Sequence, residues 1–326
     1  MHALHEVEAV RALIEASGDF HFIAGSHQAL DALPRGNWIG GTIPYFMDPS
    51  GGVTDRRRVF VQTLPRALAT EVTVDVVDTA RLSGVYERIP ENGFSMLILP
   101  AFSEVHAQFA MNAPNYPGFA TGPLIGWISG VHLDDIGKLP AEVFDGRTGR
   151  SYSDHGVVAS VKLPRDRYAE LGIVNLFKQG EGAAIEFPEG GWSVQRAKVD
   201  GVEVDFAAWC RAQSVDAKLP LVADYSGAMI NVSFQHIDED KVAFYAPVFP
   251  GVTYRQAAPV GDYPTEFAKV APDFEVAFAC NCILNYLYAG LEGRKTSVTG
   301  PITFGEIAYQ LLNQTMAWMR VRSLEG

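Results

Sequence analysis

The chain has 326 residues, 48% of them hydrophobic and 20% charged, which suits a folded protein with a large core and excludes a disordered chain. The formal net charge is -12 and the basic residues are scattered, with one short run at residues 56–58, so nucleic acid is not an expected partner. Three cysteines are too few for a disulfide framework, and no apolar stretch is long enough to span a bilayer, so we expect a cytoplasmic protein without a membrane partner.

In chain order, an amphipathic helix at residues 5–16 is followed by many runs of β-branched and aromatic residues separated by glycine and proline. Strands are predicted at residues 57–64, 73–79, 94–100, 156–164, 242–249 and 275–280. Further helices are predicted at residues 103–111, 168–171, 206–213 and 282–291. The strands outnumber the helices without strict alternation, which predicts an α+β fold with mainly antiparallel sheets, for example a layered α/β/β/α sandwich of two similar halves.

Three segments share a pattern in which apolar residues pass through a glycine or small-residue step into further apolar residues: "NWIGGTIPYFM", "PLIGWISGVHL" and "PLVADYSGAMINVSF". They are either equivalent strands of a duplicated unit or three separate buried strands with glycine bulges. The expected division places one half at residues 1–212 and the other at residues 213–322. Residues 323–326 are expected to be a remnant of an expression vector.

Motifs for metal, nucleotide and serine chemistry are absent from the sequence. The segment "LDDIGKLP" resembles the His-Asp-Ile-Gly-Lys motif of metal phosphohydrolases, but Asp134 stands where that chemistry needs a histidine ligand. The glycine-rich segments lack the Lys-Ser/Thr of a phosphate loop, and no GxSxG elbow occurs. We therefore expect neither a metal nor a cofactor.

A strand that closes on cysteine is the sharpest catalytic feature. Cys280 and Cys282 end an apolar run and precede apolar residues at helical spacing, and a helix N-terminus at that point would favour a thiolate. One alternative is thus a cysteine-dependent hydrolase or an acyl or amide transferase, with His236 or His132 as the base. The other alternative is that both thiols are buried and structural, as free cysteines usually are.

Polar residues embedded in apolar sequence form the candidate binding set. Asn281 and Asn285 are four residues apart and can share one helix face, where they either contact a ligand or cap the helix. Glu306 lies in an apolar stretch, in which a carboxylate needs a partner or a wet cavity. The set consists of Glu306, Asn281, Asn285, Asp224, Tyr225, Trp127 and Asn313, and we expect it to line a pocket between the two halves.

The C-terminal third, residues 216–322, resembles the FIST family of sensory domains. The resemblance rests on "VAFACNC", a strand closing on a cysteine, and then on "GPITFGEI" and "LLNQTMAWM". The segments "NWIGGTIPYFM" and "RRVFVQTL" are similar, more faintly, to the N-terminal half of that family. Ile283, Leu284 and Asn285 stand where the family commonly has a glycine-arginine pair. The resemblance implies that residues 303–319 form strands, although their apolar spacing also fits a helix.

The resemblance and the polar set together imply a stand-alone, non-catalytic sensor of a small polar metabolite, with amino acids the usual suggestion for the family. A signalling partner is expected but not identified. Glu306 would accept hydrogen bonds from an ammonium or hydroxyl group, the two asparagines would orient the ligand, and Tyr225 or Trp127 would supply apolar contact.

Overall fold

The computed structural model describes residues 2–225 and 227–324, and the chain divides into two compact units. The larger unit contains the described residues of Met1–Val174, Phe267–Leu311 and Met316–Gly326, and the smaller unit those of Asn175–Glu266 and Leu312–Thr315. Residues 325–326, which end the expected vector remnant, lie outside the described part. Across the described ranges, no helix has both the length and the apolar character needed to cross a bilayer.

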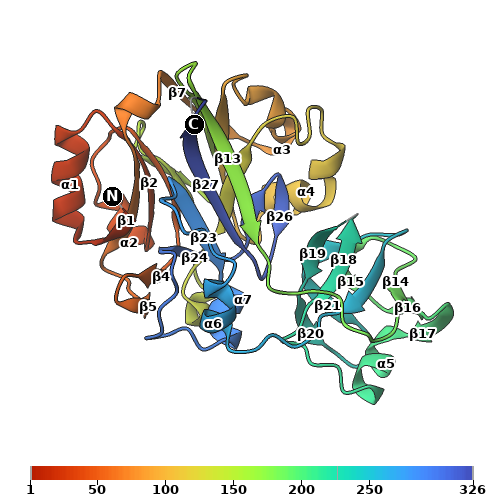
Figure 1. The fold of residues 1–326 in the computed structure, drawn as a ribbon. Helices are drawn as coiled ribbons and strands as arrows, with labels where there is room; N and C mark the ends of the chain where they lie inside the picture. The colour runs from red at the N-terminus through yellow and green to blue at the C-terminus, as the bar shows by residue number, and fades with distance from the viewer. Residues whose placement is uncertain (1, 226, 325–326) are drawn as a thin grey trace. The chain divides into compact units, whose positions relative to one another are not determined.

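Three successive repeats of one pattern build the larger unit (Figure 1): strand, helix, strand, helix, strand, hairpin, strand. Repeat 1 consists of β1 (His2–His5), α1 (Val7–Ala16), β2 (Phe20–Gly25), α2 (His27–Asp31), β3 (Trp38–Thr42), β4 (Tyr45–Asp48), β5 (Gly51–Thr54) and β6 (Val59–Leu64). Repeat 2 consists of β7 (Glu71–Val77), α3 (Thr79–Leu82), β8 (Gly93–Pro100), α4 (Glu104–Asn112), β9 (Leu124–Ser129), β10 (Val143–Asp145), β11 (Arg150–Tyr152) and β12 (Gly156–Lys162). Repeat 3 consists of β13 (Arg167–Val174), α6 (Tyr263–Ala268), β23 (Phe278–Cys282), α7 (Ile283–Tyr288), β24 (Gly300–Thr303), β25 (Glu306–Ala308), β26 (Gln310–Leu312) and β27 (Met316–Ser323). Residues 263–266 of α6 and Leu312 of β26 belong to the smaller unit.

Each repeat forms the body of one six-stranded sheet and adds its hairpin to the edge of another. The strand orders are β1-β6-β2-β3-β10-β11, β7-β12-β8-β9-β25-β26 and β13-β27-β23-β24-β4-β5. The hairpin of repeat 1 therefore extends the sheet of repeat 3, that of repeat 2 the sheet of repeat 1, and that of repeat 3 the sheet of repeat 2. Because this exchange is cyclic, every repeat completes its sheet with strands from another repeat.

Parallel pairs at the sheet centres explain the long apolar runs in the sequence. β2 runs parallel to β3, β8 to β9 and β23 to β24, and α2, α4 and α7 make the crossovers that parallel pairing requires. β8, with the sequence GFSMLILP, is buried at every position. The amphipathic α1 buries Val10 and Ile14 in a cluster that also contains Ile23 of β2.

The smaller unit is mainly β-structure. Its elements are β14 (Ile185–Glu186), β15 (Gly191–Val194), β16 (Arg196–Val199), β17 (Val202–Asp205), α5 (Phe206–Ala212), β18 (Leu221–Tyr225), β19 (Ala228–Val232), β20 (Phe234–Ile237), β21 (Val242–Val248) and β22 (Thr253–Gln256). The sheets have the orders β17-β16-β14-β22-β18-β19 and β15-β21-β20. The segment Leu312–Thr315 belongs here because Asn313 donates its side-chain amide to the Asn231 carbonyl at 3.0 Å and Gln314 donates to the Lys218 carbonyl at 3.1 Å.

The expected fold class is confirmed, since 43% of the chain is strand and 18% is helix, with mostly antiparallel sheets. The six predicted strands correspond to β6, β7, β8, β12, β21 and β23, and residues 303–319 contain β25 and β26 rather than a helix. The helix predicted at residues 168–171 is wrong. That segment lies in β13, which pairs with β27 from Arg167 to Val174, and this long-range pairing overrides the local spacing of apolar residues.

The internal organisation differs from two similar halves. The expected boundary at residues 212–213 falls inside the smaller unit, and the chain instead passes between the units at 174–175, 266–267, 311–312 and 315–316. A polar stretch after a helix has the composition of a linker, but it leads into β18, which pairs with β22 of the same sheet. Of the three similar segments, "NWIGGTIPYFM" and "PLIGWISGVHL" contain the equivalent strands β3 and β9, whereas "PLVADYSGAMINVSF" contains the antiparallel pair β18 and β19 of the smaller unit.

Candidate functional site

The structure divides the expected binding set between the two units. Asn281, Asn285, Glu306 and Trp127 lie in the larger unit, and Asp224, Tyr225 and Asn313 lie in the smaller one. None of the seven is among the residues that line the cavity described below. The seven residues of the expected set are therefore not all contained in one unit.

Glu306 belongs to the core of the larger unit. It is the first residue of β25, is 0% exposed, and pairs in register with Trp127 of β9. Trp127 stacks on Phe278 with ring centroids 5.5 Å apart. Glu306 is thus a buried residue of the larger unit, and its role in ligand binding stays a prediction.

Burial also dominates the chemistry of the two cysteines at the end of β23. The Cys280 thiol donates to the Gly126 carbonyl at 3.5 Å, and burial, together with the nearby Glu306, raises the pKa of this thiol well above its ordinary value. Asn281 accepts hydrogen bonds from the Cys282 backbone N–H at 2.7 Å and from the Asn285 amide at 2.9 Å. The two asparagines do not share one helix face, because Asn281 lies in β23 and Asn285 in α7. Their side chains bond to each other, and Asn281 also bonds to the start of α7.

The candidate residues of the smaller unit each have a local structural partner. Asp224 accepts from the Gly227 N–H at 2.6 Å in the turn between β18 and β19, where Tyr225 is 45% exposed. Asn313 accepts from the Ser233 N–H at 3.0 Å, and its role is to attach the segment 312–315. His236, a candidate base, pairs with Asp238 at 3.1 Å on an exposed strand, and the cysteines that it was expected to serve belong to the other unit.

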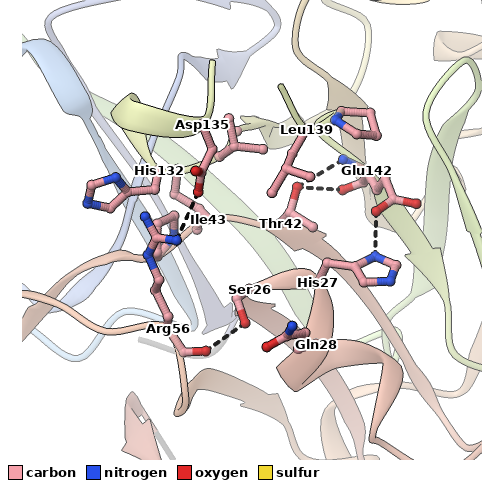
Figure 2. Close-up of a pocket in the computed structure, with 14 residues that line it drawn as sticks. Ser26, His27, Gln28, Thr42, Ile43, Arg56, His132, Asp135, Leu139 and Glu142 are labelled. Atoms are coloured by element: carbon pink, nitrogen blue, oxygen red, sulfur yellow. Dashed lines mark hydrogen bonds and ion pairs between the residues drawn. The ribbon is translucent and has the colours of Figure 1, made fainter. Parts of the chain in front are cut away.

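A cavity of about 440 Å³ lies in the larger unit (Figure 2). Its walls come from the start of α2, the end of β3, the link between β5 and β6, and the link between β9 and β10. The lining residues are Ser26, His27, Gln28, Thr42, Ile43, Pro44, Arg56, Gly130, Val131, His132, Asp135, Leu139, Pro140 and Glu142. The cavity therefore combines an apolar lining with charged and hydroxyl side chains from two repeats.

Glu142 is the fixed point of one wall. Its Oε2 lies 2.5 Å from Nδ1 of His27, and its Oε1 accepts from the Ser151 hydroxyl at 3.0 Å. Its backbone N–H donates to the Thr42 hydroxyl at 2.9 Å, and its carbonyl accepts from the Thr42 N–H at 2.9 Å. The Glu142 side chain is 15% exposed and that of His27 is 51% exposed, so a positioned carboxylate supports an accessible imidazole (Figure 2).

An ion pair crosses the opposite wall. Nη1 of Arg56 lies 2.9 Å from Oδ2 of Asp135, and the Arg56 carbonyl accepts from the Ser26 hydroxyl at 2.7 Å (Figure 2). His132, one of the expected bases, stacks on Tyr45 with ring centroids 5.5 Å apart. The hydroxyl of Tyr45 accepts from the Leu133 N–H at 3.0 Å. Asp135 and His132 are thus attached to repeat 1 although they belong to repeat 2.

The cavity exists where the threefold pattern is broken. Between the third strand and the hairpin, repeat 1 has only residues 43–44 and repeat 3 only residues 304–305, whereas repeat 2 has residues 130–142. This longer segment, which we call the 130–142 link, contributes half of the lining residues, including Asp135 and Glu142. An elaboration at one of three equivalent positions therefore builds the site.

Sequence reasoning reached some of these residues without recognising the site. The run at residues 56–58 contains Arg56, the segment "LDDIGKLP" contains Asp135, and His132 was a candidate base. Ser26, His27, Thr42 and Glu142 were missed because they are separated by up to 116 positions and converge through the pairing of β10 with β3. No signal in the sequence alone marks these positions as one site, because the link lengths can be compared only after the structure shows the three repeats.

No group of three or more His, Cys, Asp or Glu side chains that could hold a metal ion occurs among the residues described. A family model described as "Family of unknown function (DUF6976)" matches residues 5–322. The comparison with curated proteins and the comparison with solved structures give no match. The cavity itself is therefore the basis for a functional assignment.

Proposed function

We propose that this chain, which belongs to the DUF6976 family of unknown function, binds a small polar molecule in the cavity of the larger unit. The observation that carries the proposal is the placement of a hydrogen-bonded pair, His27 with Glu142, and an ion pair, Arg56 with Asp135, on a partly apolar cavity. A few convergent polar groups on an apolar lining are typical of small-molecule sites. At about 440 Å³, the cavity is also within the usual size range of such sites.

The positions of the polar groups support binding over a purely structural role. The Glu142 carboxylate is held by three elements, since it contacts α2 through His27 and β11 through Ser151 while its backbone bonds to β3. Such a rigid group loses little side-chain freedom when a ligand contacts it. Arg56 remains half exposed and is able to donate further hydrogen bonds.

A non-catalytic sensory role is part of the proposal. It follows the resemblance of the C-terminal third to FIST domains, and the 130–142 link offers a segment that a ligand can contact directly. A cytoplasmic setting is part of it as well, because Cys210, Cys280 and Cys282 are free thiols, as a reducing compartment would maintain them.

Thermal unfolding in the presence of a library of neutral, anionic, cationic and zwitterionic metabolites, amino acids included, tests the proposal. A ligand that binds the folded chain raises the midpoint of unfolding by mass action. We expect a selective rise that Glu142→Gln, for a neutral or cationic hit, or Arg56→Gln, for an anionic hit, reduces by about tenfold in apparent affinity, because a hydrogen bond to a charged group is worth about 1.5–3 kcal/mol.

Glu87→Gln is the matched control, since Glu87 is exposed and is not one of the lining residues. It should bind as the wild type does. A library without any hit, or a hit whose affinity neither Glu142→Gln nor Arg56→Gln changes, would count against the cavity as the binding site.

A further inference from the structure

The ion pair between Arg56 and Asp135 has a feature that separates it from an ordinary surface pair. Arg56 belongs to repeat 1, whereas Asp135 lies on the 130–142 link, the segment that exists in this length in one of the three repeats. The guanidinium is half exposed and the Asp135 side chain is 21% exposed, so Asp135 occupies the inner side of the pair. The Asp135 carboxylate of the chain itself therefore already binds the Arg56 guanidinium, the cationic group of the cavity.

We infer that the cavity takes a compact oxyanion, a carboxylate or a phosphate, which binds Arg56 in place of Asp135. This inference rests on the proposed function and adds the chemical class of the ligand. A guanidinium has five N–H donors in a planar fork and matches carboxylate and phosphate geometry. Asp135 acts as an internal stand-in for that ligand and keeps Arg56 ordered until the ligand arrives.

A further donor on the cavity supports an anionic ligand, since Gln28 at the start of α2 offers a side-chain amide. The remaining acid, Glu142, is engaged by His27 and Ser151. Asp135 is therefore the acidic group that opposes an incoming anion.

The attachment of the 130–142 link shows how Asp135 can give way. Apart from the ion pair, the link is attached to repeat 1 near Asp135 through the Leu133 N–H on the Tyr45 hydroxyl and the stacking of His132 on Tyr45. These two contacts remain when the Asp135 side chain turns away from Arg56. Replacement of Asp135 by the ligand thus requires only that the Asp135 side chain leaves Arg56. The backbone of the 130–142 link stays attached to repeat 1.

Titration of the full chain with inorganic phosphate and, separately, with acetate tests this inference, with sodium chloride at matched ionic strength as the reference. The readout is the apparent Kd from midpoints of thermal unfolding. The variants are Arg56→Gln, which removes the anchor, and Asp135→Asn, which keeps the shape of the side chain and removes its charge. Asp135→Ala removes the Asp135 carboxylate altogether and serves as a second variant of this position.

Neighbouring positions supply matched controls. Arg57→Gln makes the same charge change as Arg56→Gln on an exposed residue outside the lining. Asp134→Asn makes the same charge change as Asp135→Asn, but on a side chain that is 84% exposed. Both controls should bind the two anions as the wild type does.

We expect at least one of the two anions to bind more tightly than chloride. Asp135→Asn and Asp135→Ala should tighten that binding by about two- to fivefold, the range of an exposed ion pair that no longer competes. Arg56→Gln should weaken it by about tenfold or more. Binding of phosphate alone or of acetate alone identifies which oxyanion the site accepts.

The inference is overturned if neither anion binds better than chloride to the wild type or to the Asp135 variants. It is also overturned if removal of the Asp135 charge fails to tighten binding or if Arg56→Gln has no effect. A neutral or cationic hit from the metabolite library that depends on Glu142 would then leave the proposed function standing and the oxyanion inference refuted. Failure of the whole library would refute both.

Discussion

Cys280 and Cys282 lie at a strand-to-helix junction, where the dipole of a helix would lower the pKa of a thiol. In this fold α7 is short and the junction is buried, so desolvation of the thiolate outweighs any favourable dipole. The pKa of Cys280 is raised well above its ordinary value, and burial raises that of Cys210 to about 12. These thiols are therefore protonated at neutral pH.

Thiol labelling with an aromatic disulfide measures this directly. We expect the three cysteines of the native chain to react slowly across pH 6 to 8, because reaction needs a local opening that exposes the thiol. In denaturant all three should react at the rate of an ordinary free cysteine. Rapid native labelling of Cys280 or Cys282 at mildly acidic pH would revive the cysteine-enzyme alternative.

His106 on α4 provides a prediction on pH and stability. Burial lowers the pKa of His106 from 6.5 to about 4 in the folded chain. Because the unfolded chain then binds the proton more readily, folding stability falls as the pH drops from about 6.5 towards 4. For this residue the loss between pH 7.5 and 4.5 is about 2 to 3 kcal/mol.

Urea unfolding of wild type and of His106→Leu at both pH values isolates that contribution. The variant should lose less stability over this interval than the wild type, by the amount just given. Equal losses in the two proteins would show that His106 does not remain neutral in the folded state.

At the level of single residues, the sequence predicted which polar side chains are buried better than it predicted what those side chains bind. The apolar surroundings of Glu306 correctly indicated a carboxylate within a largely apolar environment, whereas the shared helix face predicted for Asn281 and Asn285 is wrong, because Asn281 lies in β23 and Asn285 in α7. Whether such groups face a ligand or each other depends on β9 and α7, which sequence spacing does not position. The binding role of these residues stays a prediction.

Among the elements, the 130–142 link distinguishes repeat 2 from the other two repeats. Its equivalents, residues 43–44 and 304–305, show that the pattern closes with two residues at this position. The longer link exposes Ile136 and Leu139 and places Asp135 and Glu142 on the cavity. We therefore assign this element to the site rather than to the stability of the fold.

Replacement of residues 130–142 by the dipeptide Phe-Gly, copied from residues 304–305, tests that assignment. The chain should still fold, with a free energy of unfolding within about 2 kcal/mol of the wild type, because loop length has a weak effect on stability. Binding in the metabolite screen should disappear.

A second variant replaces residues 130–142 by a glycine-serine segment of equal length. It distinguishes the effect of link length from the effect of the link's side chains. It should also fold and fail to bind. Loss of cooperative unfolding in both variants would show that the link is required for the fold.

Elements whose pattern lies in their own local sequence were predicted, and elements that depend on contacts distant in the chain were not. Apolar runs such as the one that forms β8 and the amphipathic pattern of α1 carry their own signal, and both were predicted. The short helices α2 and α3 were missed because so few residues show no full helical period. β13 was predicted as a helix because its assignment depends on β27, about 150 positions away in the chain.

For the whole molecule, the cyclic exchange of hairpins places the site between segments of repeats 1 and 2. β10 of repeat 2 pairs with β3 of repeat 1, and this pairing brings Glu142 to Thr42 and Asp135 to the cavity wall opposite it. A single sequence with a weak internal similarity shows neither the number of repeats nor the exchange. The expectation of two halves therefore failed although the fold class was correctly predicted.

The insertion of the smaller unit hid the third repeat from sequence analysis. It separates β13 from β23 by about a hundred residues, so the third copy of the pattern is discontinuous. Its polar residues Asp224, Tyr225 and Asn313 satisfy bonds or turns within that unit. Our account therefore places ligand binding in the larger unit alone.

A crystal structure of the chain with the strongest hit of the metabolite screen is the most direct test of that claim. We predict electron density for the ligand in the cavity, in contact with Arg56 or Glu142, while the core around Glu306 stays unchanged. Ligand density at any other position, with the cavity free of ligand at saturating concentration, would contradict the account.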